Sequence, residues 1–206
     1  MQNQSIEISK LRCDNRENPA GIDNQKPRFG WVLDSNEPGQ KQTAYRIIVS
    51  SSQKQFGKSI GDLWDSGKVL SNQTVHVTYN GKKLVSGQSC YWKVKIWDKD
   101  DAESEWSDSG FWSMGLLHES EWQARWIGRN RDLKEYRLKY KGKELFLPPS
   151  PFLRKQFAIG HKPVKATLFA TALGAYEMRL NGKRVGDDFF TPGWTDYKKR
   201  IYYQTY

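Results

Sequence analysis

The chain has 206 residues, which is room for one large domain or two small ones. Hydrophobic residues make up 37% of it, and no apolar run approaches the roughly 20 residues of a membrane-spanning helix, so we expect no membrane span. Aromatic residues reach 14%, with nine Trp, and provide large side chains for a core. This composition argues against an intrinsically disordered chain.

The N-terminus and the cysteines bear on the compartment and on metal binding. Residues 1–10 lack the basic start and apolar centre of a secretory signal. The compartment therefore stays open: cytoplasmic if Met1 is the native start, periplasmic or extracellular if a signal has been removed. Cys13 and Cys90 lie far apart and outside any CxxC motif, so thiolate metal binding is excluded. We expect two buried free thiols, with a disulfide as the alternative.

The net charge of +10 is unevenly distributed. Residues 1–118 carry 15 Lys and Arg against 14 Asp and Glu, whereas residues 119–206 carry 18 against 9. Much of the excess lies in the basic stretch 129–147, which ends at the proline-rich run 148–151 and is predicted to be a solvated insertion. A nucleic-acid arm would need more interleaved aromatic residues for base stacking. We therefore expect no nucleic-acid partner.

The first half of the chain predicts short strands separated by polar turns. In residues 43–49, Tyr45, Ile47 and Val49 alternate onto one face, as in a strand with one buried side. The pattern recurs at 75–79 and 91–97, and a return strand is expected at 110–114. Only residues 51–63 suit a short helix. The spacing indicates an antiparallel β-sandwich of about 100 residues.

Tryptophan is abundant in this half. It contains six: Trp31, Trp64, Trp92, Trp97, Trp106 and Trp112. Six tryptophans are too many for one core, so some of them are predicted to face a neighbouring domain or a glycan.

Five ordered blocks carry a family resemblance. They are residues 18–23, 27–31, 40–45, 62–69 and 86–94. Together they resemble the N-terminal fibronectin-III-like domain of bacterial α-L-rhamnosidases, glycoside hydrolase family 78. The segment 121–128 is similar to the linker that follows this domain in the family, whereas the basic insertion is longer than the family's usual connection.

The second half adds to this resemblance. Asn181-Gly182 between two alternating runs predicts a β-hairpin. Residues 180–183, 186–187 and 192–197 resemble the jelly-roll domain that comes next in the same enzymes and is related to carbohydrate-binding module family 67. The strand-like stretch that ends the chain would leave an unpaired edge. We therefore expect an incomplete second domain and a much longer native protein.

The predicted fold class is all-β, a fibronectin-III or immunoglobulin-like antiparallel sandwich followed by a truncated jelly roll. The expected domains are residues 1–117 for the sandwich, 118–151 for the linker with its basic insertion, and 152–206 for the start of the jelly roll. The family resemblance implies an N-terminal accessory region that braces a downstream catalytic barrel, which is its expected partner in the same polypeptide.

No catalytic residue is expected in this chain. Inverting glycoside hydrolysis uses two carboxyl groups in a preorganised cleft, and in the rhamnosidase family these lie in a downstream helical barrel. The acidic residues of 98–105 are predicted to form a solvated patch. None of the three histidines lies in a catalytic or metal-binding spacing.

A sugar-binding role is a further hypothesis, because aromatic faces and bidentate polar groups hold sugars. The candidate residues are Asn181, Asp187, Asp188, Trp194, Asp196 and Tyr197. The resemblance implies that related modules bind L-rhamnose with a calcium ion, which carboxylate oxygens suit. Structural alternatives stay open: Trp194 as a core or interface anchor, Asn181 as a turn residue and the aspartates as turn caps.

Two rival functions remain beside the accessory one. A stand-alone carbohydrate-binding module would bind rhamnose-containing glycans, and an adhesion or scaffold module would need the fold alone. Neither the natural substrate nor the oligomeric state follows from the residues.

Overall fold

The computed structural model describes residues 6–129, 137–146 and 149–206. By its internal contacts the chain divides into one unit of Met1–Glu121 with Thr167–Tyr206, and a second of Trp122–Ala166. This division groups residues by their contacts and does not test the expected domain boundaries after residues 117 and 151, which stay a prediction. No helix among the described residues has the length and apolarity to cross a membrane.

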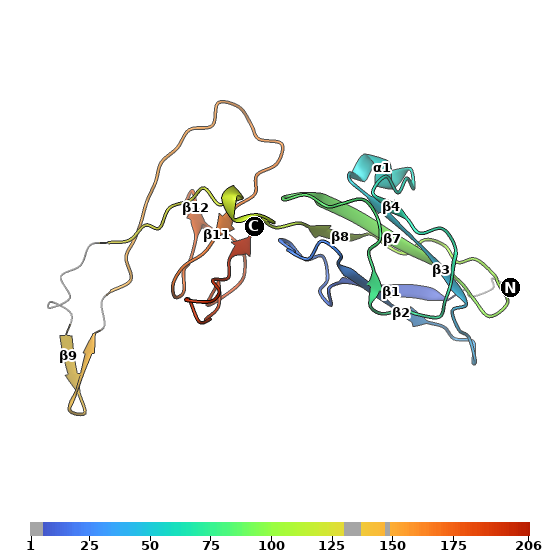
Figure 1. Ribbon diagram of the computed structural model, residues 1–206, viewed down its shortest axis with the longest axis horizontal. Coiled ribbons are helices and arrows are strands. Elements are labelled where there is room, and N and C mark those ends of the chain that lie inside the picture. Colours follow the sequence, from blue (N-terminus) through green and yellow to red (C-terminus); the bar gives the residue numbers. More distant parts are fainter. Residues whose placement is uncertain (1–5, 130–136, 147–148) are drawn as a thin grey trace. The chain divides into compact units, whose positions relative to one another are not determined.

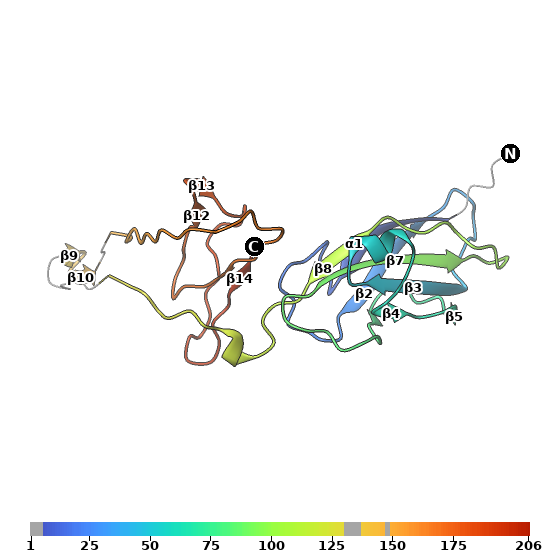
Figure 2. The ribbon, with the colours of Figure 1, turned by 90° about the horizontal axis from the view of Figure 1, so that it is seen from above.

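Two antiparallel sheets form the sandwich (Figures 1 and 2). One sheet has the order β1 (Glu7–Cys13), β2 (Arg28–Asp34), β6 (Val77–Thr78). The other has the order β4 (Trp64–Asp65), β3 (Ala44–Ser50), β7 (Ser89–Trp97), β8 (Gly110–Ser113), and β5 (Val69–Leu70) also pairs with β3. The predicted antiparallel sandwich is confirmed.

The strand β3 is buried more completely than its alternation predicts. Tyr45, Ile47 and Val49 are buried as expected, but Ile48 on the opposite face is also fully buried. The short helix α1 (Gln53–Gly57) and the loop after it pack over that face, and Gly61 approaches Ile48 so closely that a Cβ there would lie 3.2 Å from it. The helix is shorter than residues 51–63: it begins after the N-cap Ser52 and ends at Gly57.

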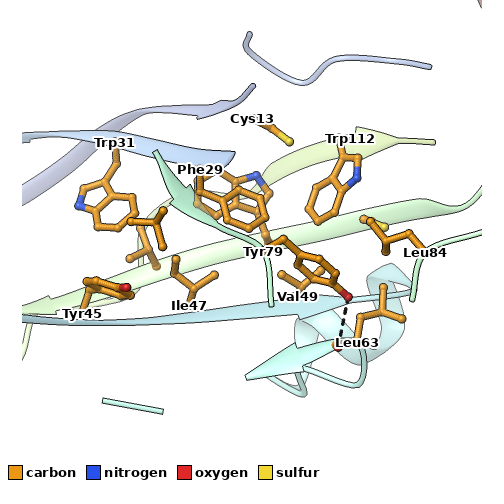
Figure 3. Close-up of a cluster of buried hydrophobic side chains, with 14 of the residues drawn as sticks. Cys13, Phe29, Trp31, Tyr45, Ile47, Val49, Leu63, Tyr79, Leu84 and Trp112 are labelled. Carbon is orange, nitrogen blue, oxygen red and sulfur yellow. Dashed lines mark hydrogen bonds between the residues drawn. The ribbon is translucent and has the colours of Figure 1, made fainter. Parts of the chain in front are cut away.

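An aromatic cluster fills the space between the sheets (Figure 3). The ring of Phe29 on β2 lies 4.4 Å from that of Trp92 on β7 and 5.3 Å from that of Trp112 on β8, measured between centroids. The hydroxyl of Tyr79 donates to the carbonyl of Lys82 at 2.8 Å, and burial raises its pKa. Large rings thus span the sandwich from both sheets.

Three of the six tryptophans, Trp31, Trp92 and Trp112, lie in this interior. Trp97 is buried outside this cluster, with the ammonium of Lys68 4.5 Å from its ring centroid, whereas Trp64 and Trp106 are half-buried. The indole N–H of Trp31 donates to the buried Oε1 of Gln42 at 3.0 Å, so its polar atom is satisfied inside. Three tryptophans thus fill the core, and the expectation that some of the six face a neighbouring domain or a glycan stays a prediction.

Both cysteines are buried and neither forms a disulfide, as expected. Burial and the neighbouring carboxylate of Asp14 raise the pKa of the Cys13 thiol. A neutral thiol in an apolar environment behaves as a small hydrophobic side chain. The disulfide alternative is wrong.

Short strands organise the C-terminal segment. β11 (Phe169–Ala170) pairs with β14 (Gln204–Thr205), so the predicted terminal strand is paired along one edge. β12 (Arg179–Leu180) and β13 (Lys183–Arg184) form the predicted hairpin, with positive φ of 50° at Asn181 and 81° at Gly182.

This segment also contacts the sandwich within the first unit. The hydroxyl of Tyr203 accepts a hydrogen bond from the backbone N–H of Leu116 at 2.9 Å. The 3-10 turn η1 (Glu119–Glu121) follows, and the carboxylate of Glu121 accepts the backbone N–H groups of Leu117 at 3.0 Å and His118 at 2.9 Å. The hydroxyl of Ser86 also donates to this carboxylate, at 2.6 Å, and this bond, followed by the two backbone bonds, lowers the pKa of Glu121. The exit of the chain from the sandwich is thereby fixed.

The basic insertion contains a hairpin that the sequence did not predict. β9 (Arg137–Tyr140) pairs with β10 (Lys143–Phe146), and Lys141 and Gly142 both adopt positive φ in the turn. Residues 137–145 are exposed, as expected of a solvated segment. Lysine is uncommon at positive φ, and for this reason the sequence did not predict the turn. Residues 130–136 and 147–148 of the insertion lie outside the described residues.

Candidate functional site

The predicted sugar-binding residues lie on the segment that contains the β12–β13 hairpin and the loops after it. Asn181 occupies the first position of the hairpin turn, with its side chain exposed. Its positive φ shows that it serves as a turn residue, which was one of the open alternatives. Asp187 and Asp188 are exposed in the next loop, and Arg184 donates to the backbone carbonyl of Asp188.

Asp196 caps a turn. Its Oδ1 accepts the backbone N–H of Lys198 at 3.1 Å, and its Oδ2 lies 3.6 Å from the ammonium of Lys199. Its backbone carbonyl accepts the N–H groups of Lys199 and Arg200. The carboxylate is therefore engaged in local structure, as an Asx turn requires. Tyr197 beside it is half-buried.

Trp194 is the exposed residue of the group. Its side chain is 90% exposed, whereas Thr191 and Pro192 just before it are buried. Trp194 is therefore not a core residue of this chain. An indole that is open to solvent suits either a sugar ring or a protein partner.

The structure does not link these six residues into one polar site. Within the described part of the chain, no hydrogen bond or ion pair joins one of their side chains to another. No group of three or more His, Cys, Asp or Glu side chains that could hold a metal ion was found among the described residues. The six residues lie on neighbouring loops, and Trp194 has the side chain most open to a ligand.

The same segment exposes other large apolar side chains. Ala170 is its one buried hydrophobic residue among those described, while many large side chains are exposed: Leu173, Leu180, Phe189, Phe190, Trp194, Ile201 and Tyr202. Phe190 is 87% exposed and Phe189 is 74% exposed. We call these seven residues the apolar surface. Phe189 and Phe190 were not among the predicted site residues, although a Phe pair directly after two aspartates is visible in the sequence.

Two family models match the chain. The description of the first is a Rha78A-like, N-terminal immunoglobulin domain, and it covers residues 8–118. The second describes the N-terminal domain of α-L-rhamnosidase and covers residues 161–206. The chain belongs to the N-terminal region of the α-L-rhamnosidase family. The resemblance read from the sequence is confirmed, and the unmatched residues between the two models hold the β9–β10 hairpin of this rhamnosidase N-terminal region.

Known relatives agree with this assignment. An α-L-rhamnosidase of Formosa agariphila is 41% identical over 189 residues, which is 92% of this chain and 20% of the relative. The structure of an α-L-rhamnosidase from Dictyoglumus thermophilum superimposes with a TM-score of 0.84 at 36% identity, covering 97% of this chain and 23% of that one. A Streptomyces avermitilis α-L-rhamnosidase complexed with L-rhamnose matches 61% of this chain and 12% of that one, at 36% identity and a TM-score of 0.58.

The rhamnosidase N-terminal region spans only part of each relative. It covers between 20% and 35% of the curated relatives that it matches. The match to the N-terminal part of longer relatives agrees with the expected accessory N-terminal region. None of the comparisons assigns a role to the six predicted sugar-binding residues, which stay a prediction.

Proposed function

We propose that this chain is the structural front part of an enzyme that hydrolyses terminal α-L-rhamnosyl residues by inversion, and that its apolar surface is covered by the polypeptide that follows. The observation that carries the proposal is this surface. Phe189, Phe190 and Trp194 lie within six positions of the chain and are all more than 70% exposed, and large apolar side chains exposed together usually mark an interface. Covering it would attach the accessory region to the remainder of the enzyme.

The test compares one substitution in two contexts. Phe190→Ser should leave the unfolding temperature of the 206-residue chain unchanged, because the side chain is already in water there. In the longer protein the same change should lower the free energy of unfolding by about 2 kcal/mol, since burial of a Phe side chain contributes about 1.5–3 kcal/mol. Thermal unfolding of both proteins measures this.

Leu70→Ser is the matched control, because Leu70 is 81% exposed on β5 of the sandwich, outside the apolar surface. It should be silent in both contexts. Hydrolysis of p-nitrophenyl α-L-rhamnopyranoside is measured in parallel, and only the longer protein should be active. Equal behaviour of Phe190→Ser in the two contexts would contradict a covered surface, and an inactive longer protein would contradict the rhamnosidase activity.

A second candidate is L-rhamnose binding at Trp194, with or without calcium. The exposure of the indole favours it, and Asp187 and Asp188 lie exposed nearby in the sequence. Carboxylate oxygens could ligate calcium at about 2.3–2.6 Å. A sugar titration followed by NMR tests this site, because the indole N–H of Trp194 gives its own signal.

A further inference from the structure

A cleft of about 380 Å³ opens along one side of the sandwich. It lies between β6, the edge strand of the first sheet, and β4 and β5 at the edge of the second. Two stacked sheets bury their facing surfaces but leave a gap along their open edges. The volume falls within the range of about 300–1,000 Å³ that is usual for small-molecule sites.

An aromatic side chain forms one wall of this cleft. Trp64 is half-buried and lines it. Its ring stacks on Phe29 at 6.1 Å with an interplanar angle of 20°, and meets the edge of Tyr79 at 5.5 Å. Both neighbours are buried in the core, so the indole is held in place before any ligand arrives. Such preorganisation lowers the entropic cost of binding.

Polar side chains line the rest. Gln73, His76, Thr78 and Asn80 are exposed around the opening. The amide of Gln73 donates to the carbonyl of Val75 at 2.8 Å, which orients the side chain. His76 has a φ of 57°, a conformation that is uncommon for residues other than glycine and is found more often at binding sites. The lining thus offers amide, imidazole and hydroxyl groups together.

The charge in the cleft is balanced. Asp65 is the one acidic residue of its lining, which contains no Lys or Arg. Arg46 neutralises it with two hydrogen bonds, from Nε to Oδ1 at 2.9 Å and from Nη2 to Oδ2 at 2.6 Å, and these bonds lower the pKa of the Asp65 carboxyl. An anionic ligand would meet a carboxylate and no free cation. The cleft therefore suits a neutral ligand.

We propose that this cleft is a carbohydrate-binding subsite that takes one neutral pyranose ring. A pyranose presents an apolar C–H face and a rim of hydroxyls, which match the indole of Trp64 and the amides of Gln73 and Asn80. The site belongs to the sandwich itself and lies outside the six residues that the sequence predicted. It needs only this chain, so the proposal does not depend on hydrolysis by a longer protein.

The test is a titration of the 206-residue chain, followed by two-dimensional 1H–15N NMR spectra of the indole N–H groups. The probes are methyl α-L-rhamnopyranoside, methyl α-D-mannopyranoside and methyl β-D-glucopyranoside. At least one should shift the Trp64 signal in a saturable way, with a Kd of about 1 mM, as expected of a small open site. Sodium phosphate at matched ionic strength should leave that signal in place.

A pair of asparagine variants separates binding from folding. Asn80→Ala removes a lining amide and should weaken binding about fivefold, the usual effect of one lost hydrogen bond. Asn72→Ala removes another exposed amide, outside the lining, and should bind as the parent does. Trp64 is left intact, because its stacking on Phe29 makes it part of the core.

Three outcomes would overturn the proposal. The first is that no glycoside shifts the indole signal of Trp64 at about 50 mM, a concentration far above the expected Kd. The second is that phosphate shifts this signal equally. The third is that only the signal of Trp194 shifts. The last result would assign sugar binding to the C-terminal segment instead. Repeating the titration with calcium and with a chelator would then show whether the ion takes part.

Discussion

Phe29→Ala is expected to destabilise the sandwich by about 4 kcal/mol, in line with Phe-to-Ala changes in protein cores. Phe29 is fully buried at the centre of the aromatic cluster, with ring centroids of Trp92 at 4.4 Å and Trp112 at 5.3 Å. Its removal would leave a cavity walled by rigid rings, which cannot close in to fill it. Urea unfolding followed by tryptophan fluorescence measures the loss.

Val32→Ala on the same strand is the control. Val32 is 39% exposed, so its truncation should change the free energy of unfolding by no more than about 0.5 kcal/mol. If the two variants lost similar stability, the cluster around Phe29 would not be the centre of the core.

Gly110→Ala should cost about 2–3 kcal/mol, although it adds only one methyl group. A Cβ at Gly110 on β8 would lie 2.6 Å from Cε2 of Trp92 and closer still to its Nε1. The backbone φ of Gly110 is not in the left-handed region, so the expected cost is steric and comes from the indole. The indole of Trp92 is buried against Phe29, which hinders its movement away from the added methyl group.

Gly57→Ala is the matched control for this glycine, because a Cβ there meets no atom within 4 Å and its φ is ordinary. Thermal unfolding should show a clear drop for Gly110→Ala and almost none for Gly57→Ala. A tolerated Gly110→Ala would mean that the two sheets can separate locally without loss of stability.

The sandwich strands followed from the sequence because their side chains alternate. The strands predicted at 43–49, 91–97 and 110–114 agree with β3, β7 and β8. Asn181-Gly182 predicted its hairpin because both residues adopt positive φ readily. The burial of Ile48 did not follow, because it depends on the loop after α1 folding back over the outer face of the sheet.

The candidate sites divide in the same way. The sequence directed attention to Trp194 and its polar neighbours, and the exposure of the indole keeps that hypothesis open. The cleft at Trp64 was not predicted, since Trp64, Gln73 and Asn80 come from separate loops and short strands with no common motif. Only the meeting of the two sheet edges brings them together.

Local pattern and family motifs therefore determined the all-β class, the antiparallel sandwich and the assignment of this chain to the N-terminal region of the α-L-rhamnosidase family. These features depend on side-chain alternation and turn chemistry, which are written into short stretches of sequence. The tertiary structure decided which tryptophans fill the core, how Arg46 neutralises Asp65, and which apolar side chains stay in water. Those outcomes depend on contacts between residues distant in the chain, and the residue order alone does not specify them.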